Sequence, residues 1–123
     1  MILPTFSKDD LKKATSEIDL IKAVAQQIIK DFAEFGLEVK FSGETSDFYK
    51  ELSVQLELHV ERLILENYSG FIGLLYRIDI GSREIAQYQE DMKGFPYPRI
   101  ITELIIHREI KKVLYREYYK NNK

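Results

Sequence analysis

The chain has 123 residues, of which 45% are hydrophobic and 31% are charged, and it contains no cysteine. This composition excludes disulfides, thiolate catalysis and cysteine metal ligands, and it is too apolar for a disordered chain. The formal net charge is −2, so the overall charge points to no particular partner. The length fits one domain over residues 1–123, and without a basic start and a long apolar run we expect a cytoplasmic protein.

The first predicted element is a short helix that begins at Ser7 and ends near Thr15. Ser16 is expected to cap a longer helix that ends near Phe35, with Gly36 as its C-cap. The apolar residues of this helix recur at alternating steps of three and four, as in a packed amphipathic helix. They are Ile18, Ile21, Ala25, Ile28, Phe32 and Phe35.

Residues 37–41 alternate between apolar and polar side chains, and we interpret them as a connector, since one strand cannot make a sheet. Residues 46–67 fit two patterns, because their apolar side chains alternate as in a strand and also share one helical face. Neither glycine nor proline occurs between Glu44 and Ser69, and a strand of that length would far exceed the usual range. We therefore predict a helix over residues 46–67, with this apolar face: Phe48, Leu52, Leu56, Val60 and Leu63.

A second, narrower apolar stripe follows from the helical interpretation of residues 46–67. Val54, Leu58 and Leu65 fall on the side opposite the main apolar face. Such a helix is either sandwiched between two layers or exposes an apolar edge. These three residues are the predicted interface.

Residues 68–70 are predicted to interrupt the chain, and residues 71–80 to form a buried helix that fills the middle of the fold. Ser82 is expected to cap a short helix that runs through Gln89. Residues 92–98 predict a loop whose aromatic and proline side chains lie over the mouth of the core, although such a segment could also be presented to a partner. Pro98 suits the first turn of the last helix, over residues 99–119, which we expect at the centre of the core.

Together these elements predict an all-α fold, an irregular bundle of about five helices. Three of them are long and form its walls: residues 16–35, 46–67 and 99–119. Charge is unevenly spread, because residues 41–70 carry two basic and six acidic side chains, whereas residues 107–123 carry six basic and two acidic ones. The two segments could attract each other within one chain or across a dimer. The basic end could also simply complement a helix dipole.

Several charged residues interrupt apolar segments and form the candidate polar cluster. Because neighbours two apart on a helix do not face each other, Arg77 and Asp79 need partners elsewhere. We expect Arg77 to pair with Glu109 or Glu103, and Asp79 to pair with Arg108. The cluster is either a pocket for an anion or acid–base chemistry, or an ion-pair network between helices, and we favour the network. Its members are Arg77, Asp79, Glu103, His107, Arg108 and Glu109.

The two histidines are further candidates. Glu103 and His107 stand four residues apart, so on a helix they could share a hydrogen bond or a metal ion. A metal would need a further ligand from His59 or Glu57. We favour a structural role for both histidines, and we predict neither a metal nor another cofactor.

The second half of the chain contains the segment Leu-Tyr-Arg-Ile-Asp at residues 75–79, which follows Leu74, and a closing helix with Arg108, Glu109, Lys112 and Val113. In these features it resembles a group of small, uncharacterised bacterial helical proteins. The resemblance implies helices here, and it implies no activity, cofactor or catalytic residue.

The basic end interleaves lysine and arginine with tyrosine, as nucleic-acid-binding segments do, but the acidic segment and a pI near 5.7 argue against nucleic acid. No motif nominates a catalytic residue, so a binding role is favoured over an enzymatic one. The leading hypothesis is protein association, as a homo-oligomer, because of the surplus apolar stripe. The alternative is a small-ligand or enzymatic pocket on the polar cluster.

Overall fold

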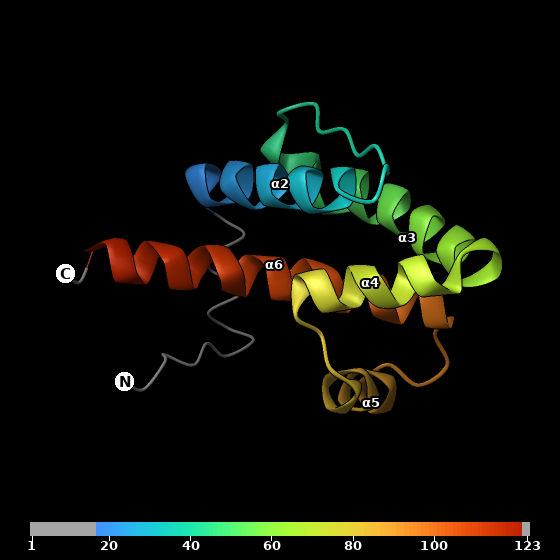
Figure 1. Cartoon of the computed structure of the whole chain (residues 1–123). Helices are drawn as coiled ribbons and strands as arrows, with labels where there is room; N and C mark the ends of the chain where they lie inside the picture. Colours follow the sequence, from blue (N-terminus) through green and yellow to red (C-terminus); the bar gives the residue numbers. More distant parts are fainter. Residues whose placement is uncertain (1–16, 122–123) are drawn as a thin grey trace.

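The computed structural model describes residues 17–121 (Figure 1). Over that range the fold is all-α, as predicted, with five α-helices, a short 3₁₀ turn and no strand. The predicted helix over residues 7–15 and its neighbour Ser16 lie outside the described residues. The elements are α2 (Ile18–Ala33), η1 (Thr45–Asp47), α3 (Phe48–Glu66), α4 (Tyr68–Ile78), α5 (Ser82–Asp91) and α6 (Tyr97–Asn121).

The axis of the bundle is α6, the longest helix at 25 residues. It packs against each of the other four α-helices, which surround it in Figure 1. The predicted central position of the last helix is therefore confirmed, and the prediction that residues 71–80 fill the middle is wrong. Helix α4 instead lies on one side of α6, because its hydrophobic residues are split between a buried face and an exposed one that carries Ile72 and Tyr76.

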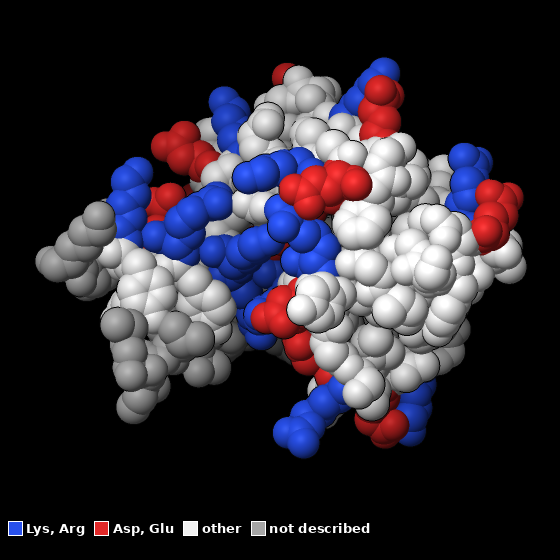
Figure 2. All heavy atoms as spheres, viewed as in Figure 1, with Lys and Arg blue, Asp and Glu red and all other residues white. Residues whose placement is uncertain are grey.

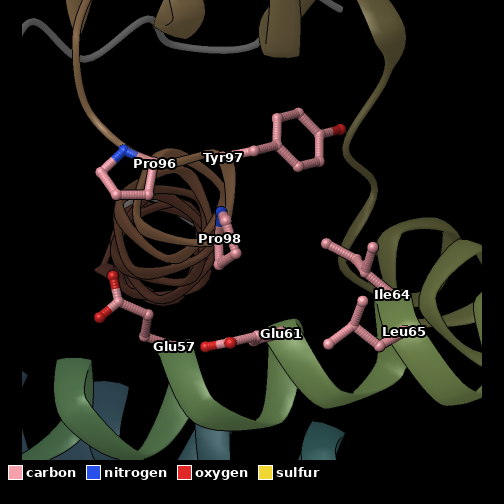
Figure 3. Close-up of a pocket in the computed structure, with 7 residues that line it drawn as sticks. All are labelled: Glu57, Glu61, Ile64, Leu65, Pro96, Tyr97 and Pro98. Atoms are coloured by element: carbon pink, nitrogen blue, oxygen red, sulfur yellow. The ribbon is translucent and has the colours of Figure 1, made fainter.

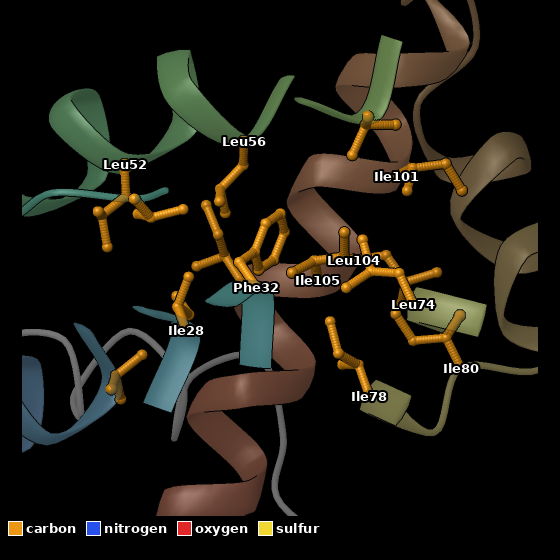
Figure 4. Packing of buried hydrophobic residues seen from close by; sticks show 14 of the residues in the cluster. Ile28, Phe32, Leu52, Leu56, Leu74, Ile78, Ile80, Ile101, Leu104 and Ile105 are labelled. Carbon is orange, nitrogen blue, oxygen red and sulfur yellow. The ribbon is translucent and has the colours of Figure 1, made fainter. Parts of the chain in front are cut away.

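The core is a continuous cluster of aliphatic side chains around Phe32 (Figure 4). Phe32 comes from α2 and lies between Leu56 of α3 and Ile105 of α6 in this view, and all three side chains are fully buried. Burial of such large side chains stabilises the fold by roughly 1.5–3 kcal/mol each.

The predicted apolar seam of α2 is confirmed except at its start, where Ile18 is 58% exposed. At the other end Gly36 has a φ of +71°. Its backbone N–H donates to the carbonyl of Ala33, and that of Leu37 donates to Phe32. This pair of bonds is a Schellman motif, so the predicted cap at Gly36 is confirmed.

The helix predicted over residues 46–67 is confirmed as α3, preceded by the turn η1. All five residues of its predicted main face are buried. The connector before it is held by side chains of α3, since Gln55 both accepts from the backbone N–H of Lys40 and donates to its carbonyl. A residue of α3 thus satisfies backbone groups that would otherwise need a second strand.

Helix α4 begins earlier than predicted. Residues 68–70 are its first turn, and only Asn67 separates it from α3. The Asn67 side chain accepts a hydrogen bond from the backbone N–H of Gly70 at 3.1 Å and so caps the helix. A Cβ at Gly70 would lie 2.5 Å from that side chain, so this glycine gives room to the cap and does not break the helix.

Asp79 ends α4 in the left-handed conformation, with φ 65° and ψ 52°. The backbone N–H of Asp79 donates to Tyr76, and that of Ile80 donates to Leu75, so this is a second Schellman motif with a residue other than glycine. The next helix, α5, has Gly81 rather than the predicted Ser82 as its N-cap, because Ser82 already has helical geometry.

Replacing Asp79 by glycine is expected to raise the free energy of unfolding by about 0.5 kcal/mol, because glycine adopts this conformation without a steric cost. The substitution also removes an ion pair with Arg108, but the Asp79 side chain is 86% exposed, so that pair contributes little. Asp79→Asn, which tolerates the same backbone but lacks the charge, measures the ion pair alone. Urea unfolding of both variants checks the prediction, and a clear loss of stability in Asp79→Gly would contradict it.

Candidate functional site

The six residues of the candidate polar cluster do not form one site. The structure divides them among three contacts on different sides of α6: Arg77 and Glu109 adjoin α2, Arg108 pairs with Asp79, and Glu103 contacts His107. The predicted pair of Arg108 and Asp79 is confirmed, with 2.7 Å between Nη2 and Oδ2.

The predicted partner of Arg77 is wrong. Its Nε lies 3.3 Å from Oδ1 of Asp31, and its Nη2 lies 2.8 Å from Oε1 of Glu34. Because α4 passes beside α2 as well as α6, an arginine near the end of α4 reaches the carboxylates of α2.

Asp31 is the centre of this arrangement, which we call the Asp31 hub: Gln27, Asp31, Arg77, Glu109, Lys112 and Arg116. The carboxylate of Asp31 is fully buried. It accepts from Gln27 at 3.1 Å, from Arg77 at 3.3 Å and from Lys112 at 3.2 Å. Burial alone would raise the pKa of Asp31, but hydrogen bonds from Glu109, Gln27 and Lys112 outweigh burial and hold that pKa below its usual value.

Glu109 is the second fully buried carboxyl group of the hub. As an ionised group neither of its oxygens has a hydrogen-bond partner, and the Nζ of Lys112 lies 3.9 Å away. Burial, together with the neighbouring Asp31, raises the pKa of Glu109 to about 9. At neutral pH Glu109 is therefore a carboxylic acid, which donates a hydrogen bond to Asp31.

The hub extends outward along α6. The guanidinium of Arg116 donates to the buried side chain of Gln27 at 2.9 Å. Figure 2 shows lysine and arginine side chains gathered over the junction of α2 and α6, with acidic side chains among them. Two carboxylates, Asp31 and Glu34, thus pair with two cations, Arg77 and Lys112, as in an ion-pair network that fixes the positions of three helices.

Asp31 was missed at the sequence level although a signal was present. It follows Ile28 by three residues and precedes Phe32, so it stands inside the apolar seam of α2. An acidic residue at such a position needs a buried partner. That rule would have nominated Asp31 as the partner of a cation from another helix.

The third contact surrounds His107. Its Nε2 lies 3.5 Å from Glu103, which confirms the predicted proximity of those two, and its Nδ1 lies 2.8 Å from the hydroxyl of Tyr88. Burial, together with Glu84 and Asp91, raises the pKa of Tyr88 to about 12. Burial also raises the pKa of Glu103.

The other histidine belongs to a different contact. His59 lies 2.8 Å from the carbonyl oxygen of Glu38 in the connector, and its ring stands 6.1 Å from that of Phe32. Between residues 17 and 121 no group of three or more histidine, aspartate or glutamate side chains could hold a metal ion.

A pocket of about 480 Å³ lies away from the hub, between α3 and the start of α6 (Figure 3). Its apolar lining consists of Ile64, Leu65, Pro96, Tyr97 and Pro98, and its acidic lining consists of Glu57 and Glu61. The predicted loop over the core is therefore one wall of this pocket. A smaller pocket of about 270 Å³ adjoins the connector, and neither of these two pockets includes a residue of the hub.

The predicted interface residues are all exposed: Val54 at 56%, Leu58 at 60% and Leu65 at 76%. Of the two arrangements considered for α3, the exposed apolar edge is therefore the one present. Leu65 belongs both to this stripe and to the wall of the pocket.

No family model matches the chain, and neither the curated proteins nor the solved structures gave a significant match. Among the described helices none is both long and apolar enough to cross a membrane.

Proposed function

We propose that the protein acts in the cytoplasm by associating with itself, and that the outer face of α3 takes part in the contact. The observation that carries this proposal is the exposure of Val54, Leu58 and Leu65 on one side of the helix. A stripe of large apolar side chains that nothing in residues 17–121 covers is typical of an association surface.

The surroundings of the stripe support the same proposal. Leu65 continues into the pocket, where Tyr97 contributes an aromatic wall. Tyr68, at the start of α4, is 59% exposed and close enough to Tyr97 to raise its pKa, in addition to the larger effect of burial. Exposed apolar and aromatic side chains beside a pocket are the composition expected of an interface centre.

The Asp31 hub gives less support to the alternative function, a ligand or enzymatic pocket. Its buried carboxylate is already saturated by three donors, and its second carboxyl group donates to the first. A ligand would have to displace these contacts at a large cost. We therefore assign the hub a structural role in positioning α2, α4 and α6.

Sedimentation velocity over a range of protein concentrations tests the proposal. Replacing Leu58 by glutamate is expected to raise the dissociation constant at least tenfold, because the contact loses the roughly 1.5–3 kcal/mol of a buried leucine and gains a charge. Ile18→Glu is the matched control, since Ile18 is 58% exposed but lies on α2. A wild-type chain that stays monomeric at the highest concentration would refute the proposed function.

A further inference from the structure

The pocket between α3 and α6 has apolar walls but two acidic side chains at one side. Figure 3 shows Glu57 and Glu61 on the same helix surface, with Ile64 and Leu65 further along it. No hydrogen bond or ion pair joins either carboxylate to another residue within the described chain. An apolar pocket of this size with two unmatched negative charges favours a ligand that is both apolar and cationic.

We propose that this pocket receives the basic C-terminal end of α6 from a second copy of the chain. This inference rests on the proposed self-association and names the surface that meets α3. Arg116 and Lys120, which are both exposed and stand one helical turn apart, are the cations that face the acidic side of the pocket.

The distribution of charge along α6 favours its C-terminal end as the part that binds the pocket of a second copy. Basic residues recur at steps of four along one face of the helix, and the inner ones are already bound. Arg108 pairs with Asp79, and Lys112 pairs with Asp31. Within residues 17–121, the one polar contact of Arg116 is with the neutral side chain of Gln27, and Lys120 lies beyond the hub. Along this face of the described helix, the positive charge without an acidic partner therefore lies at the C-terminal end, on Arg116 and Lys120.

The same chain cannot fill its own pocket in this way. Tyr97 and Pro98, in the first turn of α6, line the pocket. Lys120 is 23 residues further along the same continuous helix, which places it about 35 Å away at 1.5 Å per residue. A second copy is therefore required to bring the basic end to the acidic pocket.

A two-fold dimer satisfies both pockets at once. If two copies lie antiparallel, each basic end meets the pocket of the other, and the assembly closes. A pairing of α3 with α3 would instead gather four glutamates, two from each copy, in one contact, and like charges in an interface repel.

Two complementary charge reversals test the pairing by sedimentation velocity. Glu57→Lys/Glu61→Lys makes the pocket basic, and Arg116→Glu/Lys120→Glu makes the end of α6 acidic. Each variant alone is expected to raise the dissociation constant at least tenfold, because both contacts of its dimer join like charges. An equimolar mixture is expected to recover the wild-type constant within about threefold, because both contacts of the mixed dimer again join opposite charges.

Controls separate this inference from the proposed function. Lys22→Glu/Lys30→Glu changes the net charge by the same amount on exposed positions of α2 and is expected to leave association unchanged. Lys120→Glu alone keeps the contact of Arg116 with Gln27, so it reports on charge without disturbing the hub. Circular dichroism melting checks that each variant is folded.

The possible outcomes distinguish self-association in general from docking of α6 into the pocket. If Leu58→Glu dissociates the protein but neither charge reversal does, the proposed function stands and the docking of α6 is refuted. If each reversal dissociates the protein and the mixture does not recover, the pairing of these two surfaces is wrong. A wild-type chain that never associates refutes both proposals.

Discussion

Replacing Asp31 by alanine is expected to lower the free energy of unfolding by about 3 kcal/mol, the lower end of the range for breaking a buried ion pair. Asp31 is fully buried and accepts hydrogen bonds from Gln27, Arg77 and Lys112. In the Asp31→Ala variant Arg77 still has a carboxylate partner, because it also binds Glu34. Lys112, in contrast, loses the carboxylate with which it pairs. The remaining acidic neighbour of Lys112 is Glu109, which is 3.9 Å away and must first lose its proton to pair with Lys112.

Urea unfolding at neutral pH measures this effect. Asp19→Ala is the control, because Asp19 is an exposed acidic residue of the same helix. That substitution is expected to change the free energy of unfolding by less than about 0.5 kcal/mol. Equal stabilities of the two variants would show that the Asp31 hub does not stabilise the fold.

The sequence predicted the helices better than the contacts between them. The apolar spacing of residues 48–63 identified α3 despite its strand-like alternation, because helix periodicity and composition are local properties. The choice of Asp31 rather than Glu109 as the partner of Arg77 depends on how α4 crosses α2, and no local pattern contains that crossing. The pair of Arg108 and Asp79 was predicted correctly because the sequence offered few other partners for these two residues.

The same distinction applies to the candidate interface. One helical wheel was enough to place Val54, Leu58 and Leu65 on the side opposite the main apolar face, but not to show that this side is exposed. The pocket beside them could not be inferred from it, because Pro96 and Tyr97 are some thirty residues away in the chain and reach α3 only through the packing of α6. The unmatched charges of Glu57 and Glu61 likewise became visible only once the possible partners among residues 17–121 had positions.

Replacing Glu109 by glutamine is expected to remove most of the pH dependence of stability between pH 5 and pH 8. The pKa of Glu109 is about 9 in the folded protein, against an ordinary value of 4.5. In this range the folded chain holds a proton that the unfolded chain releases. The stabilisation from this proton is therefore fully present below the unfolded pKa, and it is lost as the pH rises toward 9.

The expected slope is about 1.4 kcal/mol per pH unit for one proton, so the wild type loses about 4 kcal/mol between pH 5 and pH 8. Glutamine has nearly the same shape and keeps an N–H that donates to Asp31, but it has no proton to lose. The variant is therefore expected to match the wild type near pH 5 and to exceed it near pH 8. Asp31 has the opposite effect on the pH dependence of stability, because its pKa is lowered in the folded protein. The stabilisation that its carboxylate provides is lost only in more acidic solution.

The two substitutions of the hub are expected to be strongly non-additive. When Asp31 is replaced by alanine, burial still raises the pKa of Glu109, but the hydrogen bond and the charge of Asp31 no longer do. We therefore expect Glu109 to ionise more readily at pH 8 and to become the carboxylate for Lys112. Glu109→Gln is therefore harmless or stabilising in the wild type at pH 8 but destabilising by about 2 kcal/mol in the Asp31→Ala background, where it leaves Lys112 without a carboxylate. A double-mutant cycle at pH 8 measures this reversal of sign. Additive effects would mean that the two carboxyl groups do not share a proton, and that Glu109 is held neutral by burial alone.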